Sequence, residues 1–402
     1  MTPEAAPRTV HIVDALRTPI GKARGVLASV RPDDLAVTVI RALMSRNSPL
    51  PPEAVEDVAF GNVNQAGEDN RNVARMALLL AGLPVSTAGV TVNRLCGSSL
   101  DAFLHAYRSI ALGEIDVAIA GGVESMSRSP FVIRRPERAL PPSLELVDST
   151  IGWRFTHPDM PEEWTVSMGA TAENLAERYG ISRERQDLFA LTSHERAVDA
   201  SEKGRFGDEL VPVTTNDGVV ERDEGPRPST SLEALSGLRP AFRGGGTVTA
   251  GNSSSINDGA SAALLVSDSA LSEYGLPSLA TVRGGAVAGV SPEIMGIGPV
   301  PASAKLLHRL GWSLEDLAAV ELNEAFAAQS LAVLSEWRVP DDWAPLNAEG
   351  GAIALGHPLG CSGVRLLATL VHRLRHRGGG LGLATMCIGV GQGIAVAIES
   401  AP

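Results

Sequence analysis

The sequence predicts an α/β fold in which helices cover a mixed β-sheet and the core is built from two similar halves. Three observations support this prediction: strand-like and helix-like segments alternate along the chain, segments of the first half return in the second, and a stretch of different composition separates the two. Such alternation is typical of sheets covered by helices. At 402 residues the chain is also too long for one ordinary core, so two or three domains are expected.

The first half opens with residues 8–14, Arg-Thr-Val-His-Ile-Val-Asp, which predict a strand. Residues 35–44 follow Pro32-Asp33-Asp34 and carry apolar side chains at helical spacing, so they predict a helix with acids at its N-terminus. Residues 58–60 predict a short buried strand, and residues 72–80 predict a second helix.

Two segments of this half recur in the second half. Cys96-Gly-Ser-Ser, a predicted helix and Asp116-Val-Ala-Ile-Ala-Gly-Gly122 are similar to Cys361-Ser-Gly, a predicted helix and Leu381-Gly-Leu-Ala-Thr-Met-Cys387. Likewise, residues 53–61 match residues 315–323. Both pairs are offset by about 260 residues, which indicates an internal duplication.

Residues 129–247 differ in composition from both halves, being richer in Pro, Arg and Glu, and predict an insertion on the duplicated core. Within this insertion we expect helices at residues 170–179 and 183–201, and a polar loop at residues 214–228. Residues 244–259 then predict a strand followed by a Gly/Ser-rich loop that opens a helix.

Charge and cysteine content exclude several functional classes. The net charge is −12 and no run of Lys or Arg could follow a phosphate backbone, so a nucleic-acid partner is not expected. No stretch approaches the length of a membrane span, and an acid stands near the N-terminus where a signal peptide carries bases, so we expect a cytoplasmic protein. The three cysteines are widely spaced, which argues against a disulfide framework or a bound metal.

Cys96 is the first candidate for covalent chemistry. It lies between a strand-like segment and a predicted helix whose apolar residues include Leu100, Phe103 and Leu104. A thiol at a helix N-terminus faces the positive end of the helix dipole, so we expect its pKa to be lowered. The alternative is that Cys96 is only a small buried apolar residue. The neighbouring Gly and Ser leave space for a substrate and favour the catalytic interpretation.

Three further segments could contribute to the same chemistry. His357 is framed by glycines in residues 350–363, and it could donate to an oxyanion or accept a proton; a packed loop histidine is the alternative. Cys387 ends a predicted strand before a Gly-rich turn whose N–H groups could face an anion. Asn323 and Glu324 lie at the mouth of a strand-to-helix junction. Gly-x-Ser-x-Gly, Walker A and complete Gly-x-Gly-x-x-Gly motifs are absent, which leaves acyl chemistry on a cysteine.

Five ordered motifs together resemble the thiolase family. They are Asn93-Arg-Leu-Cys-Gly-Ser-Ser99, Gly121-Gly-Val-Glu-Ser-Met126, Asn323-Glu-Ala-Phe326, Gly356-His-Pro358 and Cys387-Ile-Gly389. The resemblance implies a thiolase fold, with two βαβαβαββ halves in five α-β-α-β-α layers and an inserted loop domain. Residues 1–128 would form the N-terminal half, completed by about 248–276, with the loop domain at 129–247 and the C-terminal half at 277–402. It also implies a homodimer or homotetramer.

The resemblance also implies roles for individual residues. Cys96 would be the nucleophile that accepts the acyl group, and Cys387 the acid/base. His357, with a water held by Asn323, would form one oxyanion hole, and the N–H groups of Cys96 and Gly389 the other. Substrate and coenzyme A contacts would come from Met168, Arg227, Ser254, Met295 and Phe326. Coenzyme A would be a co-substrate, with no permanently bound cofactor, and Cys361 would have a packing role only.

Three positions depart from the family pattern. Ser99 and Ser255 stand where many members have Gly, and Val390 interrupts a Gly-Gly pair. None is a reacting group, so we expect an active thiolase that cleaves 3-ketoacyl-CoA or runs the reverse condensation. Residues 61–84 and 151–155 look most like 3-oxoadipyl-CoA thiolases. A biosynthetic acetoacetyl-CoA thiolase and a non-catalytic acyl-CoA-binding relative are the alternatives.

Overall fold

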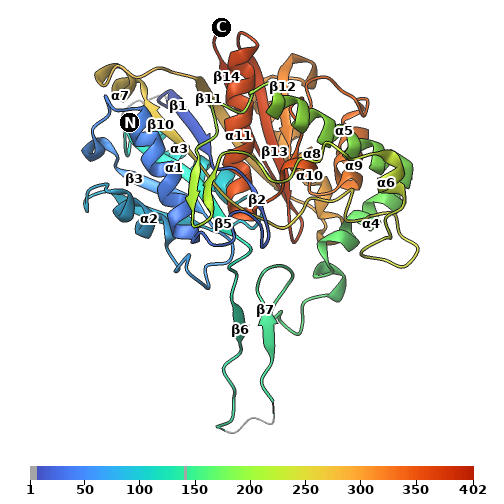
Figure 1. Cartoon of the computed structure of the whole chain (residues 1–402). Helices are drawn as coiled ribbons and strands as arrows, with labels where there is room; N and C mark the ends of the chain where they lie inside the picture. Colours follow the sequence, from blue (N-terminus) through green and yellow to red (C-terminus); the bar gives the residue numbers. More distant parts are fainter. Residues whose placement is uncertain (1–6, 140–142) are drawn as a thin grey trace, which may run out of the picture.

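The computed structural model describes residues 7–139 and 143–402, and within them a ten-stranded mixed sheet forms the centre of the molecule (Figure 1). Its strand order is β12-β13-β14-β11-β1-β10-β5-β3-β4, with the two-residue strand β2 (Gly21–Lys22) beside β10. The order consists of two blocks that meet where β1 pairs with β11 through only two residue pairs. The strands of one block lie between residues 10 and 267, and those of the other lie between residues 280 and 400.

The first block contains the strands β1 (Val10–Arg17), β3 (Asp57–Gly61), β4 (Ala88–Val92), β5 (Val117–Ser125) and β10 (Asn257–Ser267). Its helices are α1 (Pro32–Arg46), α2 (Val73–Ala81) and α3 (Ser98–Leu112). The side chain of Asn72 accepts from the Arg75 N–H at the start of α2, and Gly113 ends α3 in the left-handed conformation. The predicted strands and helices of this half are therefore present, with ends shifted by a few residues.

The second block repeats the arrangement. It contains the strands β11 (Ala280–Gly289), β12 (Leu317–Leu322), β13 (Gly380–Ile388) and β14 (Gln392–Ser400), and the helices α8 (Pro299–Leu310), α9 (Ala327–Trp337), α10 (Ala352–Leu355) and α11 (Leu359–His376). The orders β1-β10-β5-β3 and β11-β14-β13-β12 match strand for strand. This correspondence agrees with the predicted duplication.

One strand of the repeat is reduced in the second half. Where the first half has β4 beside β3, the second has a single bridge between Val320 of β12 and Leu346. The backbone N–H of Val320 donates to the Pro345 carbonyl, and that of Asn347 donates to the Val320 carbonyl. Pro345 has no N–H with which to extend the pairing. The counterpart of β4 in the second half is thus present only as this bridge.

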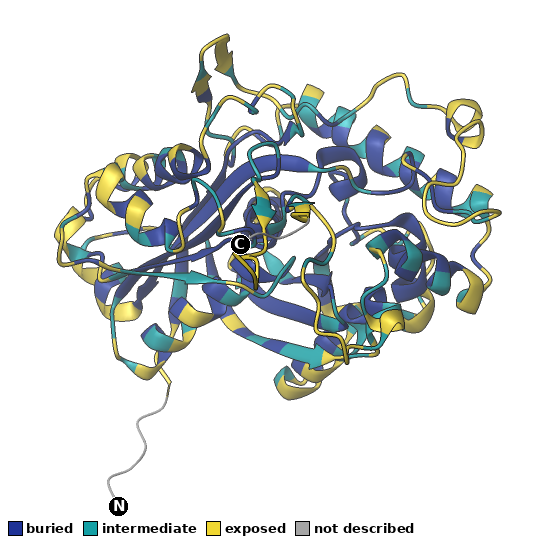
Figure 2. Ribbon diagram, turned by 90° about the horizontal axis from the view of Figure 1, so that it is seen from below, coloured by how far each residue is buried: buried dark blue, intermediate teal, exposed yellow. Residues whose placement is uncertain are grey.

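Helices α3 and α11 lie between the two blocks and create five layers. Both contact the first block, and both also contact strands of the second block. Helix α1 covers the outer face of the first block, and α8 covers that of the second. Figure 2 shows the sheets and the central helices as buried, with exposed residues on the outer faces of the covering helices. The N-terminal ends of α3 and α11 lie in the interior of the molecule, where the candidate site lies.

The inserted segment between β5 and β10 agrees with the prediction in its helices but differs in its loops. Helices α4 (Met168–Tyr179) and α5 (Arg183–Glu202) begin at the side-chain caps Ser167 and Ser182, which explains why local sequence located them. The predicted polar loop at 214–228 instead contains the hairpin of β8 (Val213–Thr215) and β9 (Gly218–Val220). The short helix α6 (Leu232–Ser236) follows.

A second two-stranded ribbon, β6 (Phe131–Ile133) and β7 (Leu146–Asp148), extends away from the body of the molecule (Figure 1). The large apolar side chains of Phe131, Ile133 and Leu146 are exposed on it. After β7 the chain returns to the body of the molecule and leads to α4 (Figure 1). Within residues 7–139 and 143–402, no helix has the length and apolar character needed to cross a membrane.

The prediction of a helix after the Gly/Ser-rich loop is wrong. Residues 257–267 form β10, a fully buried strand between β1 and β5. The Ala-rich sequence of this segment favours helix locally, but strands on both sides supply partners for its backbone groups. Tertiary pairing therefore overrides the local preference.

Candidate active site

Cys96 lies in a tight turn between β4 and α3. Leu95 has a φ of +47°, and the hydroxyl of Ser98 links the turn by donating to the Leu95 carbonyl at 2.6 Å and accepting from the Arg94 N–H at 3.0 Å. Gly97 packs against β13, because a Cβ added there would lie 2.5 Å from Cδ1 of Ile388. The turn therefore presses Cys96 against the end of β13, where Cys387 lies.

The expected lowering of the Cys96 pKa is wrong for the free protein. Burial raises the pKa of the Cys96 thiol to about 11, while hydrogen bonds from the backbone N–H groups of Gly389 and Cys96 oppose that rise. Helix α3 begins only at Ser98, and no cation is among the groups that affect the thiol. The loss of solvation thus outweighs the favourable dipoles. Cys96 is nevertheless partly exposed, whereas Cys361 and Cys387 are buried.

Cys387 occupies the next-to-last position of β13, paired with Gly393 of β14. Burial raises the pKa of the Cys387 thiol, and the negative charge of the Cys96 thiolate raises it further. The two thiols therefore lie within electrostatic reach of each other. The turn beyond Cys387 places the N–H of Gly389 at Cys96. Val390 adopts a φ of +58°, a conformation that costs a β-branched residue about 1–2 kcal/mol.

Asn323 and His357 form the other part of the site. Asn323 follows β12, and its backbone N–H donates to the Thr385 carbonyl. Its Nδ2 lies 3.4 Å from Nε2 of His357, while its Oδ1 has no partner among the described residues. The other ring nitrogen of His357, Nδ1, lies 2.6 Å from the Ser362 hydroxyl. The amide and the imidazole thus share one buried wall, with the Asn323 Oδ1 free to hold a water.

His357 is electrically neutral at physiological pH. Burial lowers the pKa of His357 to about 3, and the positive charge of Arg365 acts in the same direction. A neutral imidazole carries one N–H, and its contact with Ser362 decides which nitrogen bears it. The Ser362 hydroxyl donates its one hydrogen to the Pro358 carbonyl at 2.8 Å, so it accepts from Nδ1–H, and Nε2 is left as the acceptor that faces the Asn323 amide. For Nε2 to donate to developing charge, the Ser362 hydroxyl must turn from the Pro358 carbonyl to Nδ1, which places the imidazole hydrogen on Nε2.

An apolar wall surrounds the two cysteines. A Cβ added at Gly389 would lie 3.2 Å from Cη2 of Trp153, 3.3 Å from Cδ1 of Leu95 and 3.5 Å from Sδ of Met168. Met295, Phe326 and Cys387 belong to one buried apolar cluster, against which Met168 packs. Trp153 was not among the residues singled out for the site, because nothing in its local sequence indicates a packing partner more than 200 residues away.

The remaining predicted contacts divide between this wall and a separate hollow. Ser254 is near Phe326, because its N–H donates to the Ala325 carbonyl and Ser253 pairs with Phe326. Arg227 is exposed at a hollow of about 290 Å³ beside α5, where its backbone N–H donates to Nδ1 of His194 at 3.3 Å. The structure thus places Ser254 beside the apolar wall and Arg227 at the molecular surface.

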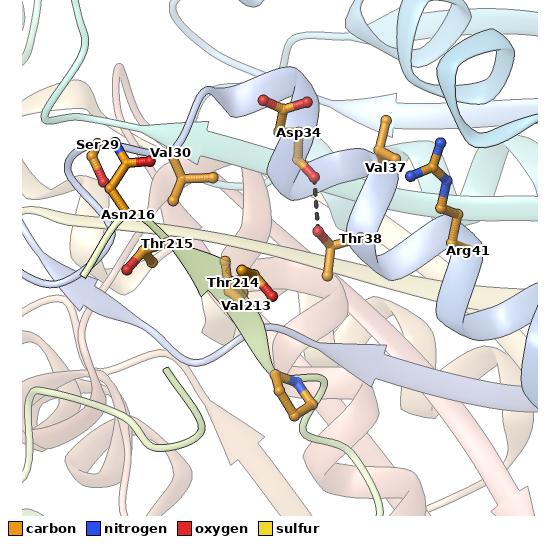
Figure 3. A pocket seen from close by; sticks show the side chains of 11 residues that line it. Ser29, Val30, Asp34, Val37, Thr38, Arg41, Val213, Thr214, Thr215 and Asn216 are labelled. Atoms are coloured by element: carbon orange, nitrogen blue, oxygen red, sulfur yellow. Dashed lines mark hydrogen bonds between the residues drawn. The ribbon is translucent and has the colours of Figure 1, made fainter. Parts of the chain in front are cut away.

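A larger hollow, of about 480 Å³, lies between α1 and the β8 hairpin (Figure 3). Ser29, Asp34, Arg41 and Asn216 are among its lining residues, and no cysteine and none of the predicted site residues line it. Within the figure the Thr38 hydroxyl donates to the Asp34 carbonyl of the same helix. This hollow has no connection to the chemistry described above.

Glu124 joins the segments of the site, although sequence reasoning gave it no role. It is 2% exposed at the end of β5. Its carboxylate accepts from the N–H groups of Val63, Asn64 and Gly360 at 3.0, 3.1 and 3.0 Å. Burial raises its pKa to about 7, against these hydrogen bonds. Because Gly360 begins the helix that carries Ser362, Glu124 helps to position the His357 loop.

The family models of the thiolase N-terminal domain and the thiolase C-terminal domain match residues 10–269 and 276–400. The chain belongs to the thiolase family. Its relatives include a beta-ketoadipyl-CoA thiolase of Pseudomonas putida, 55% identical over 98% of this chain and 99% of the relative. The 3-oxoadipyl-CoA/3-oxo-5,6-dehydrosuberyl-CoA thiolase of Escherichia coli is 52% identical, again over 98% and 99% of the two chains.

Solved thiolase structures share the fold over nearly the whole chain. The acetyl-CoA acetyltransferase of Bacillus anthracis superposes with a TM-score of 0.91 at 42% identity, covering 98% of this chain and 99% of that one. Human mitochondrial 3-ketoacyl-CoA thiolase in complex with CoA superposes with a TM-score of 0.92 at 41% identity, covering 98% of each chain. Thiolases are acyltransferases, so the chain is an acyltransferase that acts on CoA thioesters.

Proposed function

We propose that this thiolase cleaves 3-oxoadipyl-CoA with coenzyme A to give acetyl-CoA and succinyl-CoA. The observation that supports the reaction is the arrangement of Cys96 against the Gly389 N–H and Cys387, with the Asn323–His357 pair nearby. The relatives named as beta-ketoadipyl-CoA thiolases support the substrate, because they are more similar to this chain than the named acetyl-CoA acetyltransferase is.

In this reaction Cys96 attacks the 3-keto carbon as its thiolate, which is the minor form in the free protein because burial raises the thiol pKa to about 11. The bond between C2 and C3 then breaks, its electron pair moves to C2, and the enolate of acetyl-CoA leaves. Cys387 gives its proton to that enolate, and the succinyl group remains on Cys96 as a thioester. Coenzyme A next gives its thiol proton to Cys387 and attacks the thioester. This step releases succinyl-CoA and restores the Cys96 thiolate.

Two separate sets of donors serve the two oxygens that gain charge. The N–H groups of Gly389 and Cys96 already lie at the Cys96 sulfur, where they can stabilise the oxygen of the acyl thioester. The neutral imidazole of His357 and a water on Asn323 would face the enolate oxygen. Met168, Met295 and Phe326 would line the acyl and pantetheine path with Ser254, and Arg227 would meet the nucleotide end of coenzyme A.

The experiment that tests this function compares purified protein on 3-oxoadipyl-CoA, 3-oxooctanoyl-CoA and acetoacetyl-CoA in the presence of coenzyme A. We expect 3-oxoadipyl-CoA to have the highest kcat/KM, with acetyl-CoA and succinyl-CoA in equal amounts. A preference for acetoacetyl-CoA would indicate the biosynthetic alternative. Binding of acyl-CoA without any turnover would indicate the non-catalytic alternative.

We also propose that the chain acts in the cytoplasm as a homodimer or homotetramer. The ribbon of β6 and β7 exposes apolar side chains away from the body of the molecule, and such a surface favours contact with another copy. Light scattering of the purified protein measures the oligomeric state. A monomer at micromolar concentration would contradict this proposal.

A further inference from the structure

The proposed substrate carries a negative charge at the far end of its acyl chain. After cleavage, the succinyl group on Cys96 ends in a carboxylate only three carbon–carbon bonds of about 1.5 Å each from the thioester carbon. The protein itself has a net charge of −12, so a buried carboxylate there needs a nearby cation. This inference rests on the proposed function and identifies the side chain that would supply the cation.

The segment before α4 places Trp153 beside the cysteine site, and Arg154 is the next residue in the chain. Gly152 and Phe155 have φ values of +82° and +53°, so the chain turns sharply on either side of Trp153 and Arg154. The indole N–H of Trp153 donates to the Val166 carbonyl at 3.3 Å, which holds its ring against Gly389. Strained backbone of this kind is concentrated at functional sites.

Arg154 is half-buried and weakly bonded. Its Nη1 and Nη2 lie 3.5 and 3.4 Å from the carbonyl oxygens of Ser149 and Asn64, which is the outer limit for a hydrogen bond. Within the described part of the chain no carboxylate lies within 4.0 Å of it. Asn64 follows β3 beside the Cys96 turn, since the Asn93 side chain donates to the neighbouring Val63 carbonyl. Arg154 therefore keeps its charge free close to the acyl wall.

Four other arginines of this region differ from Arg154 in their contacts or their exposure. Arg94 lies 2.9 Å from the Asp101 carboxylate, and Arg128 pairs with Glu68. Arg365 lies 3.9 Å from the Glu321 carboxylate and has no hydrogen-bond partner within the described residues, but its guanidinium is fully buried and has no exposed surface that could meet a substrate. Arg134 stacks on the Phe155 ring at 4.7 Å but is exposed on the outer side of the segment. A guanidinium can bind a carboxylate through two parallel N–H donors, so Arg154 suits this role by charge and geometry.

We infer that Arg154 binds the terminal carboxylate of the acyl group and makes this thiolase selective for dicarboxylic 3-oxoacyl-CoA substrates. Trp153 and Met168 contact the intervening methylene groups, and the guanidinium closes the far end of the pocket. The backbone carbonyls of Ser149 and Asn64 hold the arginine in place without neutralising it. The side chain that binds the carboxylate thus belongs to residues 151–155, one of the two segments whose sequence looks most like 3-oxoadipyl-CoA thiolases.

The test measures kcat/KM of the Arg154→Gln variant on 3-oxoadipyl-CoA and on 3-oxohexanoyl-CoA, which has the same chain length without the carboxylate. We expect a loss of about 10- to 100-fold on 3-oxoadipyl-CoA, the range for a charged hydrogen-bonded pair, and little change on 3-oxohexanoyl-CoA. Arg154→Lys should recover part of the lost activity. Arg134→Gln is the matched control and should behave like the wild type on both substrates.

The outcomes separate this inference from the proposed function. If wild-type protein does not prefer 3-oxoadipyl-CoA over 3-oxohexanoyl-CoA, the proposed substrate is wrong. If the wild type has that preference and Arg154→Gln keeps it, the inference about Arg154 is wrong. An equal loss on both substrates would show a structural role and would also overturn the inference. A loss confined to 3-oxoadipyl-CoA, with the same far-UV circular dichroism as the wild type, supports it.

Discussion

Glu124→Gln removes a buried carboxylate that joins three segments of the proposed active site. In the wild type one carboxylate oxygen accepts from Asn64, and the other accepts from Val63 and Gly360. Glutamine has only one acceptor oxygen, so its NH2 group must face at least one of these N–H donors. Relative to the wild type above pH 7, where the carboxylate is ionised, we expect this mismatch to cost about 1–3 kcal/mol.

We expect the difference in free energy of unfolding between this variant and the wild type to depend on pH. Burial raises the pKa of Glu124 from 4.5 to about 7, so the folded protein holds this proton more tightly than the unfolded chain does. The corresponding free energy is about 3 kcal/mol, at about 1.4 kcal/mol per pKa unit. Between pH 4.5 and 7 the folded state binds more protons, so the wild-type free energy of unfolding decreases as the pH rises. Because glutamine does not titrate, the free energy of unfolding of the variant does not show this decrease.

Urea unfolding of both proteins at pH 5, 6, 7 and 8, followed by tryptophan fluorescence at one protein concentration, measures the effect. We expect the free energy of unfolding of Glu124→Gln, relative to wild type, to increase by about 2–3 kcal/mol from pH 5 to pH 8. The control is Glu114→Gln, an exposed site just after α3, whose difference from wild type should not vary with pH. A constant difference for Glu124→Gln over this range would refute the argument from burial.

Four further predictions concern the thiols and the histidine. Limiting iodoacetamide should label Cys96 first, because Cys96 is the partly exposed thiol. The labelling rate should keep rising up to pH 10, because burial raises the pKa of this thiol to about 11. Labelling of Cys361 before Cys96 would contradict this prediction. Cys361→Ala should keep kcat/KM within about tenfold, since its thiol only packs; a larger loss would show a catalytic role. Cys387→Ser should still form an acyl adduct by intact mass but lose deuterium exchange at the acetyl-CoA methyl group, and wild-type exchange would assign the base elsewhere. His357, with a pKa of about 3, should show the chemical shifts of a neutral imidazole from pH 5 to 8 by NMR, and a titration in that range would refute its burial.

Features that depend on neighbouring residues in the chain were predictable from the sequence. The bounds of α4 and α5 follow from serine caps and helical spacing, which act within a few residues. The duplication was visible because equivalent elements keep similar apolar patterns in both halves. The ordered motifs around Cys96, His357 and Cys387 indicated the family, since each motif is contiguous.

Features that depend on distant residues were decided by the tertiary structure. Residues 257–267 form a strand because β1 and β5 lie on either side of them. The pKa of Cys96 rises because the fold removes water from its thiol, although the local dipoles alone would favour the thiolate. Trp153 reaches the site only through packing against Gly389. Burial and pairing depend on contacts between segments far apart in the chain. Local sequence patterns could therefore propose the reacting groups but could not predict their environment.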